Sequence, residues 1–295
     1  MLQFHGENQR RRFFEGWYLK HQNADQTLAL IPAYHVDASG QASASVQIIT
    51  DHQSFALPFS AGDFYAHPHQ FHVQLGQNHF DKNGLFLDIH TPDCQLTGSL
   101  RYGPWHPPET DMMGPFRFLP FLQCHHGVLS LFHTVTGTLT LNGVPYCFDA
   151  DQGYIEKDWG RSFPSRYLWT QTNDLGISNA CVMLALATVP IGRIPFTGCI
   201  CIIAYQGQTY RLATYRGVRI LAHSRTQALL EQGDYRLHVQ LLSPASHPLQ
   251  APVQGDMSRI IHESPSCRVR YRFWESQRVL FDHISERAGF EYAET

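Results

Sequence analysis

Charge and long apolar runs are both scarce in this sequence, and each shortage excludes a class of protein. Charged residues make up 16% of the 295 residues, fewer than a protein covered by surface helices needs. The net charge is −3, and basic residues are scattered except for Arg10, Arg11 and Arg12, which argues against a nucleic-acid-binding surface. No apolar stretch predicts a membrane span or a signal peptide, so we expect a cytoplasmic protein.

Motifs of nucleotide and nucleophile chemistry are missing as well. The sequence contains no Gly-x-Ser-x-Gly, no glycine-rich phosphate loop and no dinucleotide fingerprint. Its seven cysteines are odd in number and form no Cys-x-x-Cys pair, which is typical of reduced thiols in a cytoplasmic protein. Cys199 and Cys201 fall on one face of an apolar run, where we expect inert packing.

Histidine, in contrast, is abundant, with 18 residues. The His-rich segment 67–72 invites a metal-binding interpretation, because alternate residues of a strand share a face. Pro68 interrupts that strand, and no Glu lies at a helpful spacing, so we predict a structural or loop role and no metal site. For His125 or His126, a role as a proton shuttle stays open.

Aromatic residues make up 13% of the chain, and short runs of alternating polarity extend along most of it. Turn sequences separate these runs at residues 37–40, 81–84 and 142–143, where Asn, Asp and Gly supply positive φ angles. Many short strands joined in this way predict an all-β protein, with a meander closed into a barrel or folded into a sandwich.

Two stretches interrupt this pattern. Residues 103–126 contain five prolines among several aromatic residues, which predicts a long ordered loop that crosses an opening. Residues 180–205 form the most apolar stretch, and Pro190, Gly192, Arg193 and Pro195 divide it into two runs of strand length, which predicts a hairpin. Helical periodicity is scarce, and residues 224–231 are too few to be more than a connector.

Acids, bases and large aromatic residues are densest at residues 153–173. If the first part is a strand, Glu156 and Asp158 share one face, and Lys157 and Trp159 share the other. Two carboxylates on an inward face could act as acid and base, because burial and mutual repulsion raise the pKa of one of them. A salt-bridged strand whose carboxylates pair with Arg161 or with residue 166 is the alternative.

The second part of this stretch alternates as well. Tyr167, Trp169, Gln171 and Asn173 would share one face, which suits the wall of a pocket with polar groups. Short sequence motifs that both combine Trp, Tyr, Gly and Lys begin at Gly16 and at residue 154. Their similarity indicates two similar β domains, residues 1–149 and 150–295.

Several phrases of the sequence resemble the tocopherol cyclase family, and they run in family order from residue 13 to residue 291. They are Phe14-Glu-Gly-Trp-Tyr-Leu-Lys20, Glu156-Lys-Asp-Trp-Gly-Arg-Ser-Phe-Pro164, Trp169-Thr-Gln-Thr-Asn173, Tyr210-Arg-Leu-Ala-Thr-Tyr215 and Ala288-Gly-Phe-Glu291. The wider relatives of the family include carotenoid hydratases. The resemblance implies two lipocalin- or calycin-like antiparallel β-barrel domains packed side by side.

The resemblance also implies an activity. Tocopherol cyclases protonate the trisubstituted double bond of a prenylated hydroquinone, and the phenol oxygen captures the cation to close a ring. Carotenoid hydratases use water instead, and both reactions are redox-neutral without a cofactor. The implied partner is a hydrophobic small molecule such as a prenylated quinol, an isoprenoid or a lipid, with peripheral membrane contact as a further expectation.

This chemistry needs an acid, aromatic faces for a carbocation and groups that orient an oxygen. We expect Asp158 or Glu156 to be the acid, Gln171 and Asn173 to orient the oxygen, and four rings to stabilise the cation. These rings belong to Trp17, Tyr18, Trp159 and Trp169. Asp158 stands where the family usually has Asn, so this chain has an extra acid. A carrier that holds a hydrophobic ligand without turnover is the competing hypothesis.

Overall fold

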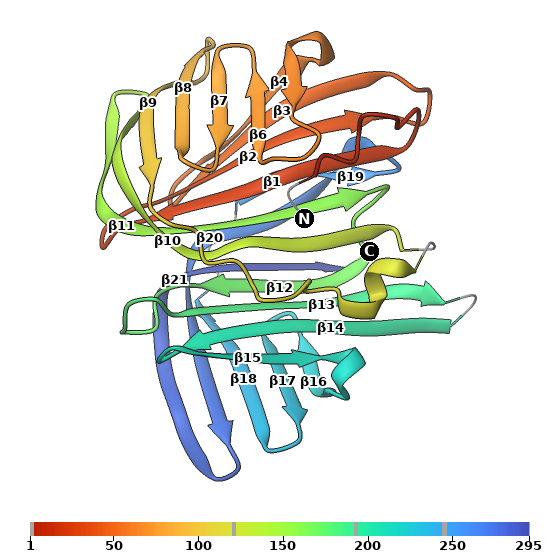
Figure 1. The fold of residues 1–295 in the computed structure, drawn as a ribbon, viewed down its shortest axis with the longest axis vertical. Helices are drawn as coiled ribbons and strands as arrows, with labels where there is room; N and C mark the ends of the chain where they lie inside the picture. Colours follow the sequence, from red (N-terminus) through yellow and green to blue (C-terminus); the bar gives the residue numbers. More distant parts are fainter. Residues whose placement is uncertain (1–2, 120–121, 192–193, 244–246, 295) are drawn as a thin grey trace. The chain divides into compact units, whose positions relative to one another are not determined.

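The structure, a computed structural model, describes residues 3–119, 122–191, 194–243 and 247–294, and its regular elements are antiparallel β-strands and three short 3-10 helices. The all-β prediction is therefore confirmed. Among the described residues, no helix is long and apolar enough to cross a membrane. The strands form two separate sheets (Figure 1).

The first sheet has 11 strands in the order β4-β3-β2-β1-β11-β10-β9-β8-β7-β6-β5. Its strands are β1 (Phe13–Gln22), β2 (Thr27–Val36), β3 (Ala42–Thr50), β4 (Ser54–Ser60), β5 (Phe64–Ala66), β6 (His72–Leu75), β7 (Asn78–Asp81), β8 (Gly84–His90), β9 (Gln95–Tyr102), β10 (Cys124–Leu141) and β11 (Val144–Gly160).

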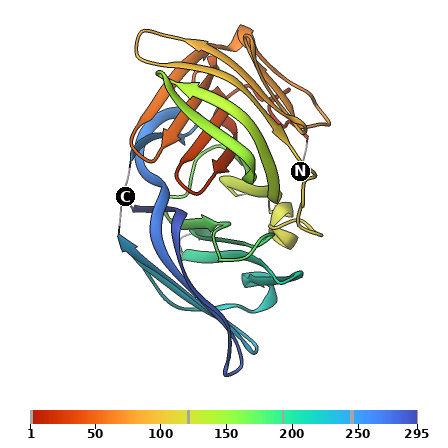
Figure 2. The same cartoon turned by 90° about the vertical axis from the view of Figure 1, so that its left-hand side faces the viewer.

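The two edges of this sheet lie close together because the chain connects them directly. The edge strands β4 and β5 are joined by the 3-10 helix η1 (Ala61–Asp63), and three residues span only about 10 Å. The sheet therefore curls until β4 and β5 nearly meet, and a short stretch of chain, not a hydrogen-bonded strand pair, closes it. Figures 1 and 2 show the resulting curvature.

The second sheet repeats this plan, with the order β15-β14-β13-β12-β21-β20-β18-β17-β16 and with β19 paired to β20. Its edges β15 and β16 are likewise joined by a 3-10 helix, η3 (Thr214–Arg216). Its strands are β12 (Arg166–Thr172), β13 (Cys181–Ile191), β14 (Ile194–Tyr205), β15 (Gln208–Ala213), β16 (Arg219–Ser224), β17 (Gln227–Gln232), β18 (Tyr235–Ser243), β19 (His247–Val253), β20 (Asp256–Glu275) and β21 (Arg278–Glu294).

The chain divides into two units, but not at the expected boundary. Unit 1 contains Met1–Asp111, Cys124–Phe163 and Leu249–Ile260, and unit 2 contains Met112–Gln123, Pro164–Pro248 and Ile261–Thr295. A boundary between residues 149 and 150 would cut β11, which belongs to unit 1 because it pairs with β1. The two similar sequence phrases are therefore hydrogen-bonded neighbours, with Trp17 opposite Lys157, and β1 corresponds in topology to β12.

Each unit has its own apolar core on one face of its sheet. In unit 1 the core includes Trp17, Leu19 and Ile155, and in unit 2 it includes Leu168, Cys199 and Cys201. Burial of these alternate side chains removes apolar surface from water, which is the main stabilising contribution in such folds. The two cysteines are packed inertly, as predicted.

The turns and the apolar hairpin also agree with the sequence pattern. Gly40, Gly84, Asn142 and Gly143 have positive φ angles of 95°, 152°, 49° and 81°. The predicted hairpin forms β13 and β14, and the predicted loop lies between β9 and β10, where its described residues include the short 3-10 helix η2 (Gly114–Phe118). Residues 224–231, expected to be a connector, instead contain most of β17, which pairs with β16 and β18.

Candidate active site

The two faces of β11 carry different chemistry. Antiparallel partners share a face, so His126 lies beside Asp158, and Val128 lies beside Glu156. Ile155 on the alternate face belongs to the core of unit 1. The two carboxylates predicted as the acid and base therefore share one face, as expected, but it is the face opposite the core.

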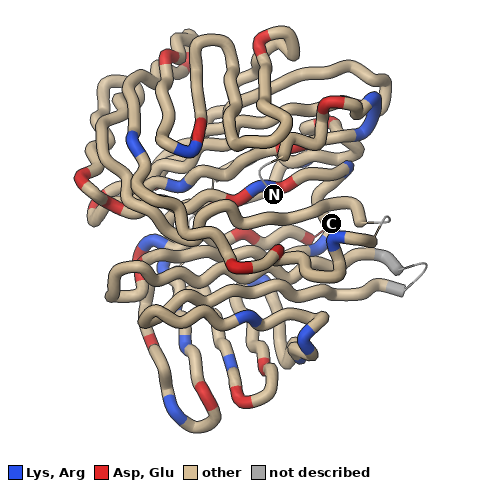
Figure 3. Tube along the Cα trace, viewed as in Figure 1, with Lys and Arg blue, Asp and Glu red and all other residues tan. Residues whose placement is uncertain are grey.

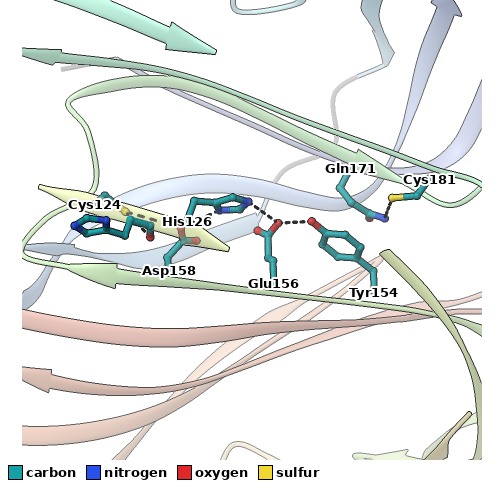
Figure 4. Close-up of polar contacts among 8 residues, drawn as sticks. Cys124, His126, Tyr154, Glu156, Asp158, Gln171 and Cys181 are labelled. Atoms are coloured by element: carbon teal, nitrogen blue, oxygen red, sulfur yellow. Dashed lines mark hydrogen bonds and ion pairs between the residues drawn. The ribbon is translucent and has the colours of Figure 1, made fainter. Parts of the chain in front are cut away.

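A chain of polar contacts connects four side chains on this face (Figure 4). Nδ1 of His126 lies 3.0 Å from Oδ1 of Asp158, and Nε2 lies 3.5 Å from Oε2 of Glu156, an ion-pair distance without hydrogen-bond geometry. The hydroxyl of Tyr154 donates a hydrogen bond of 2.6 Å to the same Oε2 of Glu156. We call His126, Tyr154, Glu156 and Asp158 the acid cluster.

Burial and charge act in opposite directions on His126. Burial alone lowers the pKa of the imidazole, but the negative charges of Asp158 and Glu156 outweigh burial and raise that pKa to about 9. His126 is therefore a cation at neutral pH. The same carboxylates act on Cys124, whose Sγ lies 3.8 Å from Oδ1 of Asp158. Burial and these charges raise the pKa of Cys124 well above its usual value, so this thiol stays protonated.

His126, Glu156 and Asp158 form the one group of three potential metal ligands among the described residues, with ligand atoms within 4.8 Å of one another. The orientation of the imidazole fits a proton better than a metal ion. Each ring nitrogen faces a different carboxylate, whereas a metal ion would need one nitrogen and both carboxylates on the same side of the ring. We therefore interpret the group as an ion-paired proton site.

The other face of β11 carries a second, separate group of charges. Nζ of Lys157 donates to Oε1 of Glu15 at 2.8 Å, and both side chains are fully buried. Lys157 also lies over the rings of Trp17 and Trp159, at 5.8 and 4.9 Å from their centroids. Trp159 stacks on His5 and His125. The indoles of Trp17 and Trp159 therefore belong to the face opposite the acid cluster.

Of the predicted cation-stabilising rings, Tyr18 is on the strand face of the acid cluster. Its Cα pairs with that of Glu156, and antiparallel partners share a face. Tyr18 is also buried. His126 is the one of the two adjacent histidines that reaches the acid cluster, whereas His125 lies on the face of Trp159. Arg166, one of the two expected partners of the carboxylates, pairs with Glu294.

The remaining predicted residues, Trp169, Gln171 and Asn173, lie in unit 2 and are buried on the face of β12 opposite its core. Nε2 of Gln171 donates to Oδ1 of Asn173 at 2.7 Å, and Nδ2 of Asn173 donates to the carbonyl of Ala180 at 2.9 Å. The side-chain amide of Asn173 therefore links the residue after β12 to the residue before β13 and stabilises the connection between these two strands.

Two other regions are rich in polar side chains. The segment 67–72 contains the loop between β5 and β6 and the first residue of β6, His72, and the backbone N–H of His69 donates to Nδ1 of His67. On the outer strands of unit 2, charges of both signs alternate (Figure 3), and Arg270 and Arg272 both pair with Asp282. Exposed pairs of this kind contribute little and form a solvated face.

Comparisons with known proteins agree with this fold. A family model described as tocopherol cyclase-like matches residues 91–293. A solved structure assigned to AttH from Nitrosomonas europaea is similar, with 14% identity, a TM-score of 0.55 and coverage of 95% of this chain and 90% of that one. Kievitone hydratase from Nectria haematococca is similar with 11% identity, a TM-score of 0.52 and coverage of 96% and 89%. No curated protein matches the sequence significantly.

Proposed function

The chain belongs to the tocopherol cyclase-like family, and from this premise we propose that it catalyses the acid-promoted addition of an oxygen nucleophile to an isoprenoid double bond. The addition is either cyclisation of a prenylated quinol or hydration. The observation that supports this proposal is the acid cluster, in which an imidazolium stands between two carboxyl groups on one strand face. The name of kievitone hydratase accords with the hydration reaction.

The charge of the acid cluster favours a stored proton. With both carboxylates ionised and the imidazole neutral, the three groups carry two net negative charges, so two added protons make them neutral. One of these protons makes the imidazole a cation and the other neutralises a carboxylate. Burial disfavours a net charge and so favours this state. Asp158 contacts Nδ1 of His126 directly, at 3.0 Å. For the state that starts the reaction we assign the second proton to Glu156, whose side chain is 6% exposed, against 23% for Asp158. The raised pKa of His126 belongs to the state in which both carboxylates are ionised.

In the proposed reaction, the acid cluster donates this proton to the substrate and later takes up a proton from the attacking oxygen. The carboxyl group of Glu156 protonates one alkene carbon, so a C–H bond forms, the π bond breaks and a tertiary cation remains. The phenol or water oxygen attacks the cation and forms the C–O bond. Its O–H proton returns to the acid cluster, which restores the starting state without oxidation or reduction. The ring of Tyr18, on the same face, is assigned to stabilise the cation.

The experiment is turnover in D₂O with a prenylated hydroquinone and a carotenoid as substrates. Cyclisation gives an isomer with one non-exchangeable deuterium on carbon, and hydration adds one D₂O, again with one carbon-bound deuterium. Glu156→Gln should lower the rate at which both products form by about 10³-fold. Asp158→Asn should also lower turnover, because it changes the group that contacts Nδ1 of His126. Asp88→Asn is its matched control and should leave turnover unchanged, because Asp88 forms an exposed pair with His90 at the same 3.0 Å distance.

Two results would reject the proposal. One is a product without carbon-bound deuterium, since the reaction would then not begin with protonation. The other is a tightly bound isoprenoid that the wild-type protein never converts, which would favour the carrier hypothesis.

A further inference from the structure

The N-terminal segment Gln3–His5 contacts the core face of unit 1 at the buried Glu15–Lys157 ion pair. The carbonyl oxygen of Gln3 accepts a bond of 2.6 Å from Nζ of Lys157. The backbone N–H of His5 donates to Oε2 of Glu15 at 2.8 Å, and Nδ1 of His5 lies 3.2 Å from Oε1. The segment thus supplies three of the polar contacts that this ion pair makes.

The side chains of the same segment fill aromatic surroundings. The centroid of the Phe4 ring lies 6.2, 5.7 and 5.5 Å from the ring centroids of Trp17, Tyr34 and Phe64, respectively. The imidazole of His5 stacks on Trp159 at 4.5 Å with an interplanar angle of 5°. A carbonyl oxygen on Lys157 and aromatic rings against indoles are the contacts that a bound aromatic molecule would make.

A separate observation points to an unfilled hydrogen bond beside these rings. Trp17 is 2% exposed, and its Nε1 has no hydrogen-bond partner among the described residues. A buried indole N–H without an acceptor costs free energy, and such groups in folded proteins usually have a partner. An oxygen of a bound molecule would provide that acceptor.

We propose that Gln3–His5 occupies a ligand site of unit 1, and that displacement of this segment opens the site to an aromatic or prenyl molecule with a carbonyl oxygen. The oxygen would replace the Gln3 carbonyl on Lys157 or accept the N–H of Trp17. The apolar part would replace Phe4 between Trp17, Tyr34 and Phe64. This proposal does not depend on the proposed function, because the acid cluster lies on the opposite face of the same strands.

The test measures binding, not turnover. The probe is a benzoquinone with a ten-carbon alkyl tail, and its affinity is measured by titration calorimetry for the wild type and for the Phe4→Ala, His5→Ala double variant. The double variant should bind the quinone at least tenfold more tightly. Phe55→Ala is the matched control, because Phe55 is also partly buried on the core of unit 1, but its register partners are Ile48 and Leu30, four residues along the strand from Tyr34. It should bind as the wild type does.

Two further measurements identify the contacts. Decylbenzene has the same alkyl tail but no carbonyl oxygen. The increase in its affinity from the wild type to the double variant should be smaller than the increase for the quinone. Lys157 should become reactive toward acetic anhydride in the double variant, and bound quinone should protect it. The proposal is overturned if the double variant is folded but its quinone affinity and Lys157 reactivity equal those of the wild type. Equal gains for quinone and decylbenzene would overturn the carbonyl assignment. Neither outcome depends on catalysis by Glu156.

Discussion

In each sheet, the first strand in chain order pairs with the last: β1 with β11, and β12 with β21. These two pairs have the same topology, but their side chains differ in chemistry. The pair β1–β11 carries the buried Glu15–Lys157 ion pair on one face and Glu156 and Asp158 of the acid cluster on the other. On β12–β21, Tyr167 donates to Glu291, and Thr170 bonds to the hydroxyl of Tyr271 and the carbonyl of Gly289. The same topology therefore carries different side-chain chemistry in the two units.

The sharpest test of this comparison replaces one buried glutamate of each unit, Glu156 and Glu291, with glutamine. Glu156→Gln removes the proposed proton donor and should lower kcat by about 10³-fold, within the range that general acids contribute. Glu291→Gln changes a carboxylate at the corresponding seam of unit 2 and should leave kcat within about threefold. Steady-state kinetics of the two variants checks this expectation. Equal losses would mean that the units share the chemistry.

The next effect concerns the ion pair found on the core face of β1–β11. Lys157→Met leaves Glu15 buried without its cation, and should lower the free energy of unfolding by about 3–5 kcal/mol. The double variant Glu15→Gln, Lys157→Met removes both charges and should lose less. In unit 2, Thr170→Val removes a neutral hydrogen-bonding group and should cost about 1 kcal/mol. Urea denaturation measures all three, and a double variant less stable than Lys157→Met would contradict this account.

The pH dependence of stability should distinguish His126 from the other buried histidines of unit 1. The raised pKa of His126, about 9, means that its contribution is complete below pH 6.5 and disappears as pH rises through 9. This contribution is at most about 3 kcal/mol. Burial lowers the pKa of His21 and His35 to about 4 and that of His133 to about 3, so their contribution is lost as pH falls below 6.5.

His126→Gln should therefore remove the decline in stability between pH 6.5 and 9 and leave the acidic decline in place. Urea midpoints measured from pH 4 to pH 10 give both declines. An unchanged alkaline decline in the variant would show that His126 does not carry the raised pKa.

The smallest effect compares two strand glycines. A Cβ on Gly153 would lie 2.3 Å from Nε2 of His133, whereas a Cβ on Gly198 of unit 2 would meet nothing closer than 3.7 Å. Gly153→Ala should cost about 1–3 kcal/mol through overpacking, and Gly198→Ala should be neutral or slightly stabilising. Thermal unfolding of both variants tests this, and Gly153→Ala with wild-type stability would show that the His133 ring moves freely.

The sequence predicted local structure well because alternation and turn residues are local signals. It placed Glu156 and Asp158 on one strand face and Lys157 and Trp159 on the other, and the structure agrees. It could not reveal that β11 pairs with β1, since the partners Trp17 and Lys157 are far apart in the chain. For that reason the boundary at residue 149 cut a strand of unit 1.

The partners of Glu156 and Asp158 could not be predicted fully, because they also depend on strand pairing. The contact of His126 with Asp158 depends on the register of β10 and β11, which shifts near Val128, Ser130 and Val135. Such bulges insert residues that a sequence pattern does not show. Trp159 was expected to stabilise the cation that the acid generates, but it follows Asp158 directly in the sequence, and adjacent residues of a strand point to opposite faces.

The placement of residues 249–260 in unit 1 has a consequence for the order in which the protein folds during synthesis. Gln250 exchanges two hydrogen bonds with Gln47, and Gly255 donates to the carbonyl of Arg161, so this late segment completes a unit whose other strands were made long before. Until the ribosome has produced it, the surface of unit 1 around Gln47 and Arg161 stays uncovered and open to aggregation. Fragments that end before Leu249 should therefore depend on chaperones.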